Sequence, residues 1–153
     1  MSENPRTTLT PKLVGALYTE AMLLADEARA YFDRHGREDR DSLEPLLRVG
    51  FSCESLKVTT RLMHVIAWLL TQRAVEAGEL SPRQARNPAR RLGEAPETDE
   101  ALLARLPESA IALINASRDL YARVQRVDEG TNVAPEPHAS PARSLLSRLE
   151  RAF

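Results

Sequence analysis

Cysteine, long apolar runs and an excess of charge are all lacking in this sequence, and each absence excludes a class of protein. Cys53 is the only cysteine, so an internal disulfide and a multi-cysteine zinc site are excluded. The longest apolar run is far shorter than the roughly 20 residues that a bilayer-spanning helix needs, and the polar N-terminus contains no apolar signal region. We therefore expect a soluble protein of the cytoplasm.

The formal net charge of −1 also argues against a nucleic-acid-binding protein, because a basic surface supplies most of the affinity for nucleic acid. The length of 153 residues fits one domain with a core large enough to need no disulfide or metal.

Motifs that carry chemistry are missing as well. His35, His64 and His138 are scattered, and none follows a glutamate by three residues, as it would in a di-iron helical bundle. No His-Glu-x-x-His motif and no glycine-rich phosphate loop is present. Cys53 falls in an apolar helical pattern, which predicts a small buried residue rather than a nucleophile. We expect no enzyme, no cofactor and no metal.

Helical periodicity predicts three long helices and no β-strand. The first begins at Pro11 and ends before Gly36, the second covers 42–77, and the third covers 107–129. Gly36 suits the left-handed position that follows a helix end, and Gly78 is the expected stop of the second helix. Short helical turns are expected between the second and third helices. The pattern predicts an all-α fold, an antiparallel three-helix bundle, over residues 10–129.

The second predicted helix is apolar on more than one side. One set of residues alternates at spacings of three and four, the heptad spacing by which a helix packs along its neighbours. Its members are Leu46, Val49, Cys53, Leu56, Thr60, Met63, Ala67, Leu70 and Ala74. A second stripe contains Leu62, Val65, Ile66, Trp68 and Leu69. Packing against two neighbouring helices accounts for such a wide arc, and contact of Leu62, Val65, Trp68 or Leu69 with a second subunit of a homodimer is the alternative.

Charged residues on the same helix have two interpretations. Glu54, Lys57 and Arg61 share one helix face, and they form either a solvated or core-edge ion-pair cluster or a docking surface for a partner. Arg73, with Glu76 and Glu79, has the same two interpretations.

The segment after Gly78 is locally basic. It contains Arg83, Arg86, Arg90 and Arg91 with no acidic residue between them. Because these arginines lie on both sides of Pro88, no regular recognition helix can hold them all. The basic character of the segment nevertheless makes a DNA-binding or transcription-regulating helical module the alternative function.

The two ends of the chain are predicted to lie outside the bundle. Residues 1–9 are polar and are expected to be disordered, and the proline-rich start of 130–153 reads as a flexible linker. The linker leads to a short amphipathic tail whose apolar residues suit a groove on a partner. Those residues are Leu145, Leu146, Leu149 and Phe153. The alternatives are a tail that folds back on its own bundle and a tail that lies on a membrane surface.

The stretch ESLKVTTRLMHVIAWLLTQRAVEAGELS, residues 54–81, closely resembles the signature helix of the RcdA-like family, the regulator-of-CtrA-degradation proteins of alphaproteobacteria. The matching pieces are ES, TTRLM, WLL, QRAV and GE, in that order and spacing. The third helix opens with LPESAIALINAS, which agrees with the same pattern. The resemblance covers residues 11–129. It transfers best to Glu54, Ser55, Thr59, Thr60, Arg61, Leu62, Met63, Trp68, Gln72, Arg73 and Glu79.

This resemblance implies an adaptor rather than an enzyme. Family members are dimeric three-helix bundles with mobile C-termini, and they deliver regulatory proteins to the ClpXP protease. The adaptor works with a response regulator of the CpdR type and recruits cargo such as CtrA. The expected partners are therefore ClpXP, the response regulator, protein cargo and a second copy, with neither nucleic acid nor membrane. Candidate partner-binding residues are Glu54, Lys57, Arg61, Arg73, Leu145, Leu146, Leu149 and Phe153.

Overall fold

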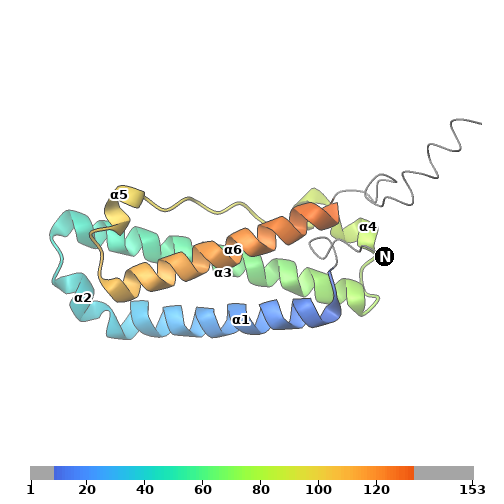
Figure 1. The fold of residues 1–153 in the computed structure, drawn as a ribbon, viewed down its shortest axis with the longest axis horizontal. Helices are drawn as coiled ribbons and strands as arrows, with labels where there is room; N and C mark the ends of the chain where they lie inside the picture. Colours follow the sequence, from blue (N-terminus) through green and yellow to red (C-terminus); the bar gives the residue numbers. More distant parts are fainter. Residues whose placement is uncertain (1–8, 133–153) are drawn as a thin grey trace, which may run out of the picture.

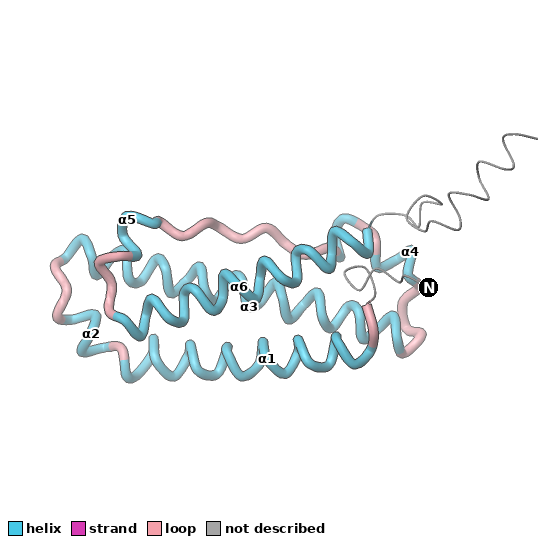
Figure 2. Tube along the Cα trace, in the orientation of Figure 1, coloured by secondary structure: helices cyan, strands magenta, loops and turns pink. Residues whose placement is uncertain are grey.

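The computed structural model describes residues 9–132, and every regular element within them is helical (Figures 1 and 2). The prediction of an all-α fold is therefore confirmed. The predictions for the N-terminal residues 1–8, for the linker beyond Asn132 and for the amphipathic tail fall outside the described residues.

The first helix begins as its sequence predicts. α1 covers Pro11–Ala30, and the Thr10 side chain caps it by accepting a hydrogen bond from the Leu13 backbone at 3.1 Å. A π-helical turn, η1, Tyr31–His35, continues it. The charged segment that follows Gly36 forms the short helix α2, Arg37–Asp41.

The long second helix is shorter than predicted by a few residues. α3 covers Pro45–Glu76 and begins with Pro45 in its first turn, where a missing backbone donor costs nothing. Gly78 ends the helix as predicted, and it does so in the left-handed conformation, at φ 76°. The prediction of that conformation for Gly36 is wrong, because Gly36 has φ −85° and leads directly into α2.

A run of short helices separates α3 from the last long helix. These are α4, Pro82–Ala85, η2, Pro88–Arg90, and α5, Glu100–Leu103. α6, Glu108–Asn132, passes through Gly130, so it continues beyond the boundary predicted at residue 129.

The third long helix runs in the direction opposite to the predicted one. Arg61 contacts Ser117 and Trp68 contacts Asp128, so α3 and α6 advance side by side in parallel. α1 is antiparallel to both, as Figure 1 shows by its colours. The prediction of antiparallel packing with short turns is wrong for this pair, because residues 77–107 return along the whole length of the molecule before α6 begins.

The core lies between the three long helices. Val14 and Leu17 of α1, Val58 of α3, and Ile114 and Leu120 of α6 are all at most 5% exposed. Leu62, Val65, Trp68 and Leu69, predicted as core or dimer contacts, are at most 3% exposed within this single chain. Their stripe therefore forms the inner face of α3.

Gly50 marks a close approach rather than a bend. A Cβ atom at this position would overlap the side chain of Leu102 in α5. Glycine therefore lets α5 pack directly on the first half of α3.

We expect Leu69→Ala to lower the free energy of unfolding by about 2–5 kcal/mol, because it leaves a cavity in the core. Leu23→Ala is the matched control, since Leu23 is 66% exposed on α1, and it should change stability by less than about 0.5 kcal/mol. Urea unfolding followed by circular dichroism measures both. Equal losses for the two variants would contradict the placement of the core.

Candidate functional site

An extended segment, residues 91–99, lies along α3 and α6, and we call it the strap. It contains no helix and pairs with no strand, so its backbone groups need other partners. Side chains of α3 and α6 supply several of them. These side chains include residues that the sequence pattern had indicated as candidates for partner binding.

Arg61 is the main anchor of the strap. It is 3% exposed, and it donates hydrogen bonds to the Pro96 carbonyl at 3.2 Å and to Thr98 Oγ1 at 2.7 Å. A third bond, at 3.2 Å, reaches Ser117 Oγ in α6. Burial lowers the pKa of Arg61, and the Glu54 carboxylate opposes that shift. One guanidinium therefore joins α3, the strap and α6.

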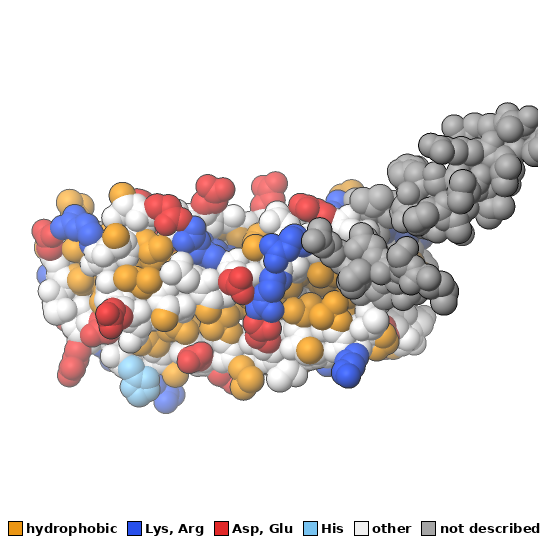
Figure 3. Space-filling model, in the orientation of Figure 1, with side chains coloured by type: hydrophobic (Ala, Val, Ile, Leu, Met, Phe, Trp, Pro, Cys, Tyr) orange, Lys and Arg blue, Asp and Glu red, His pale blue; other side chains and the backbone are white. Residues whose placement is uncertain are grey.

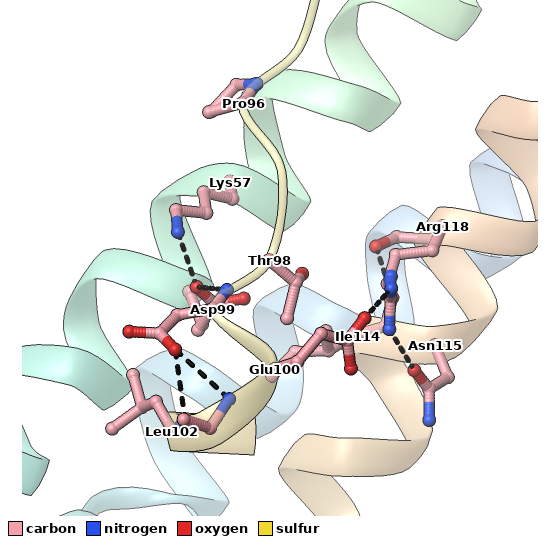
Figure 4. A network of polar contacts seen from close by, with 12 residues as sticks. Lys57, Pro96, Thr98, Asp99, Glu100, Leu102, Ile114, Asn115 and Arg118 are labelled. Atoms are coloured by element: carbon pink, nitrogen blue, oxygen red, sulfur yellow. Dashed lines mark hydrogen bonds and ion pairs between the residues drawn. The ribbon is translucent and has the colours of Figure 1, made fainter.

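Glu54 holds the C-terminal end of the strap, at Asp99. Its carboxylate is fully buried, and Oε2 accepts hydrogen bonds from Lys57 Nζ at 2.7 Å and from the Asp99 backbone at 3.4 Å (Figure 4). Asp99 in turn caps α5 by accepting from the Ala101 and Leu102 backbones. Lys57 thus neutralises the buried charge of Glu54, and the hydrogen bond from Asp99 to Glu54 holds the residue that caps α5.

The N-terminal end of the strap, at Arg91 and Gly93, is held by α6. Asp128, 6% exposed, accepts from Trp68 Nε1 at 2.8 Å and pairs with Arg91 at 2.9 Å. The Tyr121 hydroxyl donates to the Gly93 carbonyl at 2.6 Å, and burial followed by the charge of Glu94 raises the pKa of Tyr121. Trp68 is thereby both a core residue and part of this polar network.

Of the two interpretations of Glu54, Lys57 and Arg61, the geometry favours the ion-pair cluster at the edge of the core. Glu54 and Arg61 face inward, so their side chains have no surface with which a docked protein could make contact. Lys57 is partly exposed beside Glu54. Arg73 is exposed, and its guanidinium stacks 4.1 Å from the Tyr18 ring of α1. For Lys57 and Arg73 partner binding stays a prediction; Leu145, Leu146, Leu149 and Phe153 lie outside the described residues.

The heptad residues of α3, which were expected to pack along the neighbouring helices, lie on the outer side of α3. Leu46, Val49, Leu56, Met63 and Leu70 are 84, 62, 67, 64 and 48% exposed. Cys53 is also exposed, so its prediction as a buried residue is wrong. We call the nine heptad residues, Leu46 to Ala74, the outer seam. α3 therefore has one apolar face in the core and a second one at the surface.

The basic segment after Gly78 forms no recognition helix. α4 has four residues and η2 has three, which is too short to lie along a major groove. Arg91 points inward to Asp128, whereas Arg83, Arg86 and Arg90 are exposed. The arginines therefore share no single surface element.

Sequence reasoning missed Thr98, Ser117 and Asp128, the buried polar partners of this network. A signal existed for two of them, because Ser117 and Asp128 fall on the inner face of α6 with Leu120 and Val124. Thr98 gave none, since its burial depends on where the strap lies.

A solved structure, RcdA from Caulobacter crescentus CB15, is similar to this chain, with 34% identity and a TM-score of 0.66. The alignment covers 85% of this chain and 98% of that one. A family model described as a protein of unknown function (DUF1465) matches residues 6–153. The chain belongs to this RcdA-like family. The family resemblance read from α3 is thereby confirmed. A search of the curated proteins found no match.

Within residues 9–132, no helix is long and apolar enough to cross a membrane. In the same described part, no group of three or more His, Cys, Asp or Glu side chains is placed to hold a metal ion. The buried polar residues found there position the strap.

Gly93→Ala is expected to destabilise the fold by about 1–3 kcal/mol, the usual cost of overpacking. The new methyl group would lie 2.8 Å from the His64 ring, which packs under the strap. His64→Ala removes that ring, so the double variant should recover part of the loss. Thermal unfolding of the four chains gives the coupling energy. Additive effects would show that Gly93 and His64 do not meet.

Proposed function

We propose that this chain is a non-enzymatic adaptor of regulated proteolysis in the cytoplasm. It would deliver regulatory proteins, such as cell-cycle factors, to the ClpXP protease together with a response regulator of the CpdR type. The observation that carries the proposal is the RcdA-like family membership, at 34% identity over 85% of the chain. The buried polar residues support it, because they are engaged in holding the strap and leave the surfaces for binding.

We further propose that the adaptor is a homodimer of three-helix bundles joined through the outer seam. Heptad spacing along α3 is the pattern by which helices pack lengthwise. Five large apolar side chains of this seam are between 48 and 84% exposed, and contiguous apolar surface of this kind marks interaction sites. A two-fold pairing of α3 with its copy would cover the same residues on both chains.

Leu56→Asp tests the dimer. The charge would lie in the middle of the seam, so the variant should be monomeric at concentrations where the wild type is dimeric. Ala112→Asp is the matched control, because it adds the same charge at another exposed helical position, on α6. Analytical ultracentrifugation over a concentration series reads the outcome. If Leu56→Asp sediments as the wild type does at every concentration, the seam is not the interface.

A reconstituted degradation assay tests the adaptor function. ClpXP, the response regulator and a fluorescent cargo such as CtrA are combined with the wild-type chain, with Leu56→Asp, with Arg73→Ala, or without the chain. The wild type should speed cargo loss, and the variants tell whether the dimer and Arg73 are required. Cargo loss at the same rate with and without the chain, for every cargo tried, would reject the adaptor role.

A further inference from the structure

A groove of about 440 Å³ opens between α1 and α3. Its apolar lining comes from Met22 and Ala25 of α1, from Phe32 of η1, and from Leu62, Met63 and Ile66 of α3. Small residues give it depth, since Ala25 and Ala28 are three positions apart on the α1 wall. This volume lies within the range of about 300–1,000 Å³ that is typical of ligand-binding pockets.

The groove has an acidic rim. Asp26 and Arg29 of α1 and Asp33 of η1 line it, so the formal charge of the rim is −2 + 1, or −1. Arg29 already pairs with Asp26 at 3.2 Å. An occupant with apolar anchors and a net positive charge would therefore suit the site.

The last residues of the chain have this chemistry. Leu145, Leu146, Leu149 and Phe153 fall on one side of a helix, at the spacing by which an amphipathic helix lies in a groove. The segment 143–153 contains three arginines and one glutamate, a formal side-chain charge of +3 − 1, or +2. Its charge is opposite to that of the groove rim.

The chain length allows the segment to reach the groove of its own protomer. Figure 1 shows that α6 ends where α1 begins, at the same end of the molecule. Met22 is about 16 Å along the α1 axis from Pro11, at 1.5 Å per residue. The 10 residues from 133 to 142 span about 33 Å when extended. The connection is therefore long enough, and its shortness raises the effective concentration of the segment near the groove.

From these observations we propose that residues 143–153 dock as an amphipathic helix in the α1–α3 groove of the same chain. The apolar side chains enter the groove, and the arginines approach Asp26 and Asp33. The docked segment withholds its apolar face from other proteins, so a partner that binds the tail has to displace it. This inference does not rest on the adaptor role and can hold whether or not ClpXP is the protease served.

The methionines of the chain make the groove directly observable. Met1, Met22 and Met63 are the only three, and the last two line the groove. A full-length chain labelled with ¹³C at the methionine methyl groups gives a separate NMR signal for each. Met63 also belongs to the outer seam, so Met22 is the decisive reporter.

Two matched variants of the full-length chain test the contact. Leu146→Asp/Leu149→Asp removes the apolar face, whereas Ser144→Asp/Ser147→Asp adds the same two charges on the polar side of the segment. We expect the first variant to shift the Met22 signal and the second to leave its environment apolar, close to the wild-type position. A Met22 signal that is identical in the wild type and the Leu146→Asp/Leu149→Asp variant would overturn the proposal.

A spin label distinguishes docking of the segment on its own chain from docking on a second copy. It is attached at Ala152→Cys in a Cys53→Ser background, and reduction of the label with ascorbate gives the reference spectrum. Loss of most of the Met22 intensity in a chain diluted with unlabelled wild type supports docking within one chain. Loss only when ¹³C-labelled chains are mixed with separate spin-labelled chains would place the segment on the second copy and overturn docking in the same chain.

Discussion

The Arg61 guanidinium is the interaction on which the arrangement of the molecule depends. The strap has no hydrogen-bonding ladder of its own, and Arg61 supplies partners for the Pro96 carbonyl and the Thr98 hydroxyl. A buried charge is costly unless its donors are satisfied, and three hydrogen bonds and the nearby Glu54 meet that condition. Because the strap is held in place, α6 can begin at the end of the molecule where α3 also begins, and it runs parallel to α3.

The same helix carries the other constraint. The inner face of α3 packs on α1 and α6, and the outer seam presents a second apolar face to the surface. A helix that served only the protomer would need one apolar stripe. The two faces explain why the sequence of α3 is apolar on more than one side.

The polar groups divide between the interior and one edge of the surface. Glu54, Arg61 and Asp128 are committed to internal contacts, while acidic side chains are spread along the edge formed by the strap (Figure 3). Exposed Glu94, Glu97 and Glu100 belong to that edge region. Apolar surface is concentrated on the outer seam and in the α1–α3 groove. Fold and surface together agree with family membership, which the comparison with RcdA shows independently.

The sequence by itself determined the helices, because capping, proline placement and 3.6-residue periodicity are local. The first helix begins at Pro11 and the second ends before Gly78, both as predicted. It also determined the family, through the signature of α3. Tertiary structure alone decided which of the two apolar stripes of α3 faces the core, since both have helical spacing. It decided the direction of α6 too, because that depends on the course of the strap. The burial of Glu54 and Arg61 followed from that course, which no local pattern records.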